Sequence, residues 1–308
     1  MKTLFFVLIA SLSLCAAPRT LTLLDGNDPK SYGTTVRLYQ PTPYGGFGDE
    51  QHRLRITRNG KVVKEWKDFS IKPLYTGDLD NDGYTEVAIL EHSGGMLCCF
   101  EIYIIRIRPE GIRISWFQFF NAVGARAKDL DGDGRVEIVS LDDIYYNDFG
   151  MSPGDSPDIE VVFNIEKDDT PHLRPALMKR YTKPHYYDHF TSDGPFFLTD
   201  KMKNYEVSAS TELIETVLFL MYTGEAAKAI KAMVRYARFD KDFDVNETLQ
   251  RLIESMSHSI FWPDICAVNG WCKASASSMK GRGVCEPLEG KAIIRTLRFA
   301  KEVLMENP

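Results

Sequence analysis

The chain has 308 residues, of which 44% are apolar and 26% are charged, and its formal net charge is −6. This length and composition are sufficient for two globular domains with buried cores. The negative net charge, without a basic amphipathic stretch, excludes the usual signature of a protein that binds nucleic acid or an anionic lipid surface.

The first residues are typical of a secretory signal peptide. Lys2 precedes an apolar run over residues 4–14, and the small residues Ala16 and Ala17 follow it. This run has roughly eleven residues, whereas a helix that spans a membrane needs about 20. We therefore expect residues 1–17 to be removed and the protein to be periplasmic or secreted. Cys15 leaves lipoprotein anchoring open as the alternative, although a leucine precedes it where a lipidation motif has a small residue.

Residues 18–173 predict an antiparallel β domain. Short runs of branched and aromatic residues alternate in polarity, as in RLRIT and KVVKEW, and turn residues separate them. Asn59-Gly60 lies between those two runs, and this dipeptide is a strong signal of a β-hairpin.

From about residue 208 onward, the spacing of the apolar residues changes to the period of an α-helix. Leu213, Val217 and Leu220 share one helical face, and Asp244 followed by Glu247 is typical of a helix start. Residues 208–308 therefore predict a small helical bundle with a cysteine-bearing loop. The aromatic segment 174–207 shows no clear period, and a linker, a closing strand and a binding surface all remain open for it.

Two acidic segments repeat almost the same pattern. DLDNDGYTEVAIL spans residues 78–90 and DLDGDGRVEIVSL spans residues 129–141. Carboxylates roughly 5 Å apart repel by about 3 kcal/mol at an effective dielectric constant near 20, unless a cation lies among them. Calcium takes six to eight oxygen ligands, so each segment predicts a calcium loop. The expected ligands are the side chains of Asp78, Asp80, Asp82 and Glu86 with the carbonyl of Tyr84, and those of Asp129, Asp131, Asp133 and Glu137 with the carbonyl of Arg135.

An EF-hand starts with the same spacing but requires a glutamate at its twelfth position. That position holds Ile89 in the first segment and Ser140 in the second, and strand-forming residues follow both. The remaining alternative to a calcium loop is a solvated Asp-rich turn without metal.

These nine-residue loops, each leading directly into a strand, resemble the FG-GAP or VCBS-type repeats of extracellular bacterial proteins. The resemblance implies blades of a β-propeller and calcium in a structural role. The loops lie 51 residues apart, which is compatible with one loop per blade. A seven-bladed propeller needs about 300 residues, so we expect a small, propeller-like β domain instead. Asp25 and Asn27 match the start of such a loop only weakly.

The cysteines predict disulfides, because export favours oxidation. Cys98 and Cys99 lie in SGGMLCCFEIYI, which resembles the SGGAHCC-type element of secreted bacterial proteins with similar acid loops. They could form a vicinal disulfide, pair separately or stay as buried thiols. In the helical part we expect Cys285 to pair with Cys272 or Cys266. A zinc site of these three cysteines with His258 is the alternative.

The sequence contains no HExxH motif, no nucleotide-binding glycine loop and no plausible glycosidase carboxylate pair outside the acid loops. The fold class we expect is β plus α in two domains, a propeller-like β domain followed by a helical bundle. The function we expect is that of an exported, calcium-stabilised binding module for a protein or cell-wall partner, with inhibition of a muramidase or toxin as its sharpest form. The alternatives are an envelope structural component and a calcium-dependent envelope enzyme acting on cell-wall or sugar substrates near His185 and His189.

Overall fold

The computed structural model describes residues 19–41, 51–94, 100–119, 122, 124–142, 144–145, 156–192, 209–273 and 285–306. The described part is mixed β and α, with three four-stranded antiparallel sheets and a group of helices. The predicted signal segment, Cys15, Cys98 and Cys99 lie outside the described residues.

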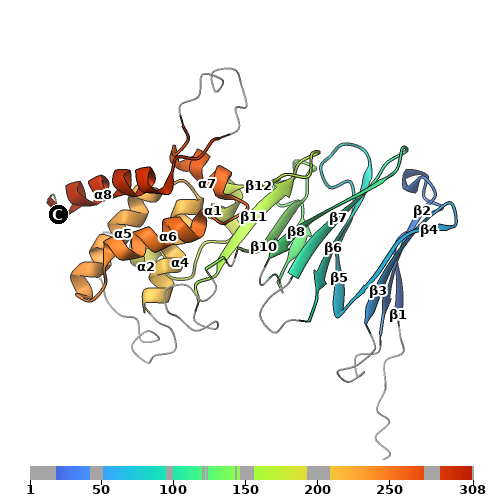
Figure 1. Cartoon of the computed structure of the whole chain (residues 1–308), viewed down its shortest axis with the longest axis horizontal. Coiled ribbons are helices and arrows are strands. Elements are labelled where there is room, and N and C mark those ends of the chain that lie inside the picture. Colours follow the sequence, from blue (N-terminus) through green and yellow to red (C-terminus); the bar gives the residue numbers. More distant parts are fainter. Residues whose placement is uncertain are drawn as a thin grey trace, which may run out of the picture.

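Each sheet is a meander in which consecutive strands pair in chain order (Figure 1). The first sheet contains β1 (Arg19–Leu24), β2 (Thr34–Gln40), β3 (His52–Arg58) and β4 (Lys61–Asp68), with the short 3-10 helix η1 (Pro29–Ser31) between β1 and β2. The second contains β5 (Ser70–Gly77), β6 (Thr85–His92), β7 (Phe100–Ile107) and β8 (Ile112–Phe119). The third contains β9 (Arg126–Lys128), β10 (Glu137–Asp142), β11 (Ile159–Ile165) and β12 (Pro171–Leu173).

The second sheet is the middle layer of the β half, and this position explains the unbroken apolar run in β6. Successive side chains of a strand point to opposite faces. Val87 and Ile89 lie in a core shared with the first sheet, whereas Ala88 and Leu90 lie in a core shared with the third sheet. A strand that is buried on both faces needs apolar residues at every position.

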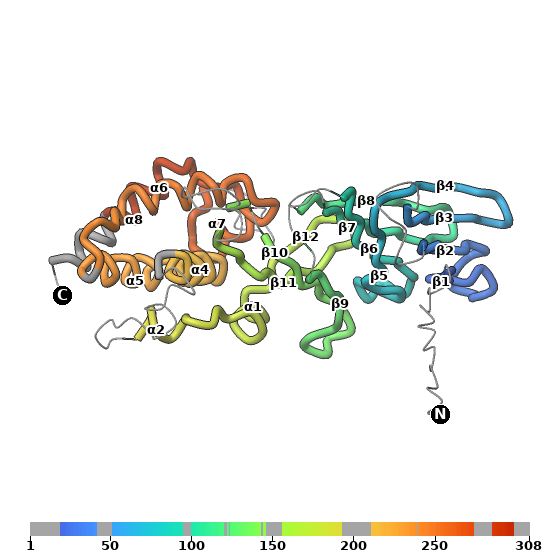
Figure 2. The backbone as a smooth tube through the Cα atoms, turned by 90° about the horizontal axis from the view of Figure 1, so that it is seen from below, coloured from blue at the N-terminus to red at the C-terminus, as the bar shows by residue number. Residues whose placement is uncertain are grey.

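The helices follow the third sheet, at the opposite end of the molecule from β1–β4 (Figure 2). They are α1 (Pro175–Tyr181), α2 (Tyr187–Thr191), α4 (Ala209–Tyr222), α5 (Ala226–Phe239), α6 (Val245–Met256), α7 (Trp262–Asn269) and α8 (Gly290–Glu306). One continuous hydrophobic core runs from the second sheet through the third sheet into these helices. Part of the aromatic segment that showed no period forms α1 and α2, which are too short to display one.

Two local predictions are confirmed. Asn59 and Gly60 have φ angles of 49° and 75°, and they connect β3 to β4 as a tight hairpin. The side chain of Asp244 caps α6 by accepting hydrogen bonds from the backbone N–H groups of Asn246 and Glu247, at 2.7 and 3.2 Å. This cap fixes where the helix begins.

The propeller itself is not confirmed. The three sheets lie face to face like successive blades (Figure 1). No sheet closes on itself among the described residues, so a mixed β and α class is what the structure supports. The disulfide in the helical part joins Cys272 to Cys285, one of the two pairings that the sequence left open, and Cys266 is a buried free thiol. Because two of its four ligands are joined to each other, the alternative zinc site cannot form.

Candidate metal centres

The two acidic segments occupy the same place in neighbouring sheets. The first acid loop, residues 78–86, connects β5 to β6, and the second acid loop, residues 129–137, connects β9 to β10. The backbone N–H of Val136 donates to the carbonyl of Leu79 at 2.9 Å. The two loops therefore lie side by side, and their contact joins the second sheet to the third.

The first aspartate of each loop folds the loop around itself. Asp78 accepts hydrogen bonds from the backbone N–H groups of Asp82 and Gly83, at 3.0 and 2.7 Å. Asp129 accepts in the same way from Gly132 and Gly134, at 2.7 and 3.1 Å. Gly83 and Gly134 have φ angles of 90° and 85°, a conformation that residues with a Cβ rarely adopt, which explains the glycine at the sixth position of both loops.

The carboxylates of each loop converge on one point. In the first loop Asp78, Asp80, Asp82 and Glu86 each offer an oxygen within 4.8 Å of the others, and in the second loop Asp129, Asp131 and Glu137 do so. The side chain of Asp133 is 42% exposed and does not belong to the second group.

The remaining two predicted ligands are backbone carbonyls. Tyr84 and Arg135 donate their N–H groups to Asp82 and Asp133, at 3.0 and 2.8 Å. These hydrogen bonds place both residues on their loops, and their carbonyl oxygens remain predicted ligands.

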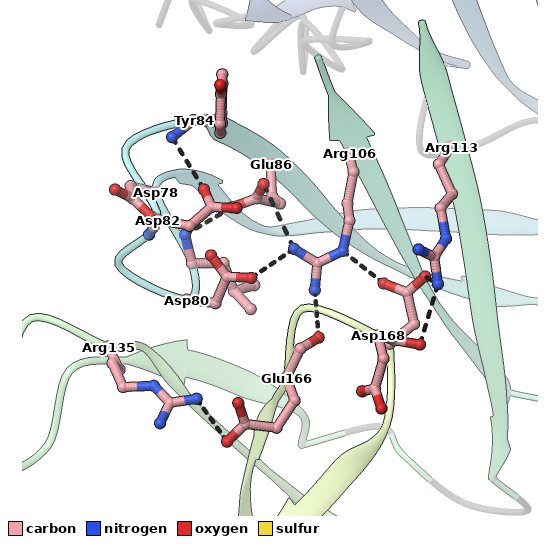
Figure 3. A network of polar contacts seen from close by, with 12 residues as sticks. Asp78, Asp80, Asp82, Tyr84, Glu86, Arg106, Arg113, Arg135, Glu166 and Asp168 are labelled. Atoms are coloured by element: carbon pink, nitrogen blue, oxygen red, sulfur yellow. Dashed lines mark hydrogen bonds and ion pairs between the residues drawn. The ribbon is translucent and has the colours of Figure 1, made fainter. Parts of the chain in front are cut away.

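The structure also brings arginine side chains to the acid loops, which the sequence analysis missed. Arg106 on β7 is 2% exposed and donates from Nη1 to Asp80 at 2.7 Å. It donates further from Nη2 to the carbonyl of Glu166 at 2.6 Å and from Nε to Asp169 (Figure 3). Arg106 therefore ties the first acid loop to the turn between β11 and β12.

A second guanidinium contacts the same loop. Arg108 donates from Nη1 to Oε1 of Glu86 at 2.6 Å and from Nη2 to Oδ2 of Asp82 at 2.9 Å. Its guanidinium also lies over the ring of Tyr84, 4.7 Å from the centroid. These contacts make Arg108 the partner of two of the four predicted carboxylate ligands.

Within the described part of the chain, Arg174 is the arginine that pairs with carboxylates of the second loop. Arg174, directly after β12, donates from Nη2 to Asp131 at 2.7 Å and from Nη1 to Glu137 at 3.0 Å. Its distance to the carboxylate of Asp133 is 3.7 Å. The side chain of Arg135, which belongs to the loop, turns away and donates to Glu166 at 2.8 Å.

The arginines do not neutralise the loops. Four carboxylates against two guanidinium groups leave a charge of −2 on the first loop, and four against one leave −3 on the second. Oδ1 of the fully buried Asp80 has no hydrogen-bond donor among the described residues. Burial, as the largest cause, raises the pKa of Glu86 and of Glu137, because it disfavours the charged form of a carboxyl group. The donor set is oxygen only, and it fits a hard divalent cation.

His185 and His189 belong to neither of the two candidate metal centres. Among the described residues, neither belongs to a group of three ligating side chains. The ring of His185 packs edge-on against Tyr186. Arg235 donates to the carbonyl of His189 at 3.3 Å, and burial followed by the charge of Arg235 lowers the pKa of His189.

A carboxyl pair on α4 also escaped the sequence analysis. The side chains of Glu212 and Glu215 interact with each other on α4, and Glu215 also interacts with the backbone of Asp158. Burial, followed by the neighbouring Glu212, raises the pKa of Glu215 to about 8. The only available signal was the spacing of two acids at i and i+3 on a predicted helix.

Comparison of the chain with protein-family models, curated proteins and solved structures finds no match. No helix in the described part of the chain is both long enough and apolar enough to cross a membrane.

Proposed function

We propose that the chain is an exported binding module, stabilised by calcium, that recognises a protein or cell-wall partner. The observation that carries the proposal is the convergence of carboxylate oxygens in two neighbouring loops that keep a negative charge after pairing with arginine. Calcium accepts this kind of oxygen ligand set. The resemblance of both loops to FG-GAP or VCBS-type repeats supports the same ion.

Calcium in these loops would have a structural role. Asp78, Asp80, Asp82 and Glu86 would hold one ion, and Asp129, Asp131 and Glu137 would hold the other. Because the loops contact each other through Val136 and Leu79, both ions would stiffen the junction between the second and third sheets. A rigid junction supports recognition, since a preorganised surface loses less entropy on binding.

Exposed apolar side chains on the β half support a macromolecular partner. Val62 and Val63 on β4, Phe69 directly after it and Trp116 on β8 are each more than half exposed. Large apolar and aromatic side chains of this kind are enriched in protein interfaces. The most specific version of the proposal is that the partner is a muramidase or a toxin, which the chain inhibits.

A pull-down from envelope extract tests the proposal. Wild-type protein in calcium should retain a partner, a chelator should release it, and Trp116→Ala should weaken the capture. Val268→Ala is the matched control, because Val268 is also exposed but lies on α7, outside the first and second sheets that carry the other exposed side chains. A partner that stays bound in chelator at the wild-type level would contradict a calcium-dependent binding surface.

A calcium-dependent envelope enzyme is the second candidate, and the carboxyl pair of Glu212 and Glu215 favours it. General acid and base catalysis uses a carboxyl group whose pKa is raised towards neutrality, as the pKa of Glu215 is beside Glu212. Turnover of cell-wall fragments that Glu215→Gln abolishes and Glu254→Gln preserves would support this candidate. Glu254 is an exposed acid on α6.

A further inference from the structure

We propose that the two acid loops are unequal: the second takes up and releases a divalent cation readily, whereas arginine holds the first, which accepts an ion only when Arg108 leaves it. This inference rests on the proposed function, because it assumes that the loops bind a divalent cation. Beyond that function, the inference states which loop binds a cation first and which side chain controls cation binding to the other loop.

Solvent reaches the two sets of carboxylates differently. In the first loop the side chains of Asp80, Asp82 and Glu86 are 0%, 10% and 0% exposed. In the second loop Glu137 is likewise 0% exposed, but Asp131 is 24% exposed and Asp133 is more exposed still. A hydrated cation can therefore approach the second loop from the side of Asp131, whereas Asp80, Asp82 and Glu86 of the first loop are covered.

The guanidinium groups that face the loops also differ in mobility. Arg106 is buried and bonded to the turn at Glu166 and Asp169 as well as to Asp80, so leaving the first loop would strip several buried partners at once. Arg174 is 25% exposed and can move into solvent while remaining charged. The second loop thus has a removable partner, and the first has a fixed one.

Arg108 is the side chain that decides access to the first loop. It is 15% exposed, it donates to both Asp82 and Glu86, and it lies over the ring of Tyr84. A cation that coordinates Oδ2 of Asp82 and Oε1 of Glu86 competes for the same oxygen atoms. Binding of the ion and release of Arg108 are therefore coupled, and each must weaken the other to the same extent.

The negative charge that arginine leaves on each loop also favours binding of a cation to the second loop first. When Asp133 is counted, which lies beside the converging group and 3.7 Å from Arg174, the second loop keeps one more unit of negative charge than the first after pairing with arginine. A divalent cation is attracted more strongly to the larger charge. Exposure, partner mobility and charge thus all favour the second loop as the first to fill.

A calcium titration by calorimetry of the purified chain tests the inference. The wild-type chain should show two classes of calcium site, one tight and one weak, with dissociation constants that differ by about tenfold or more. A difference of about tenfold is what the loss of one charge-assisted hydrogen bond produces. Asp131→Asn should remove the tight class, and Asp82→Asn should remove the weak class. Arg108→Gln should strengthen the weak class by about tenfold.

Arg113→Gln is the matched control. Arg113 pairs with Asp169 at the same turn but contacts no carboxylate of either loop, so both classes should stay as in wild type. Equal affinities at the two loops, or a tight class that Asp82→Asn removes and Asp131→Asn preserves, would overturn the inference and leave the proposed function intact. No heat of binding in any variant, including Arg108→Gln, would overturn both.

Discussion

Arg106 offers the sharpest test of the network around the first acid loop. Replacing it by methionine keeps much of the side-chain volume but removes the charge that Asp80 and Asp169 share. Since Arg106 and Asp80 are almost completely buried, the variant leaves buried carboxylates without their partner. Breaking a buried ion pair from one side costs about 3–5 kcal/mol of unfolding free energy.

This loss should be visible in both thermal and urea unfolding. For a domain of 150–250 residues, each kcal/mol lowers the melting temperature by about 2–4 °C, so Arg106→Met should lower it by roughly 6–20 °C. Arg113→Met is the control, because Arg113 is 57% exposed and pairs with the same Asp169. An exposed pair contributes about 0–1 kcal/mol. If Arg106→Met unfolds within about 1 kcal/mol of wild type in urea, the buried network does not carry the stability assigned to it here.

Further predictions concern the other parts of the chain. Replacing Cys272 and Cys285 by serine should cost about 3 kcal/mol in urea unfolding under oxidising conditions, since their bond spans 13 positions, and an unchanged midpoint would argue against the bond. Burial and a neighbouring aspartate raise the pKa of Glu91 from its ordinary value near 4.5 to about 8. The native state then holds a proton that the unfolded state releases, so stability should fall as the pH rises from about 4.5 to about 8, and the pH dependence should flatten in Glu91→Gln. Tyr222→Phe should cost about 1–3 kcal/mol, because it removes a hydroxyl that donates to the buried carboxyl group of Asp142 at 2.7 Å; a loss below about 0.5 kcal/mol would contradict a stabilising role for this buried hydrogen bond.

Local patterns predicted the features that neighbouring residues determine. The hairpin at Asn59-Gly60 and the cap at Asp244 follow from the backbone preferences of a few consecutive residues. The acid loops follow from one charge pattern seen twice, and the structure brings their carboxylates together as that pattern implies. The mixed β and α class follows from the change of hydrophobic period along the chain.

Long-range pairing escaped the same reasoning. Arg106 meets Glu86 because β6 and β7 pair in a register that places these residues opposite each other. Arg174, which lies between β12 and α1, reaches Glu137 of the second loop across 37 positions of the chain. Neither contact has a local signal. The acidic pattern by itself therefore indicated a metal as the source of positive charge for the loops, whereas arginine supplies part of that charge.

Equilibrium dialysis of the purified chain against labelled calcium tests the central claim most directly. The account predicts two ions per chain, and it predicts that combining Asp80→Ala with Asp131→Ala abolishes this binding together with the rise in melting temperature that calcium produces. A metal-replete chain that retains no calcium, or a double variant that binds as wild type does, would contradict it.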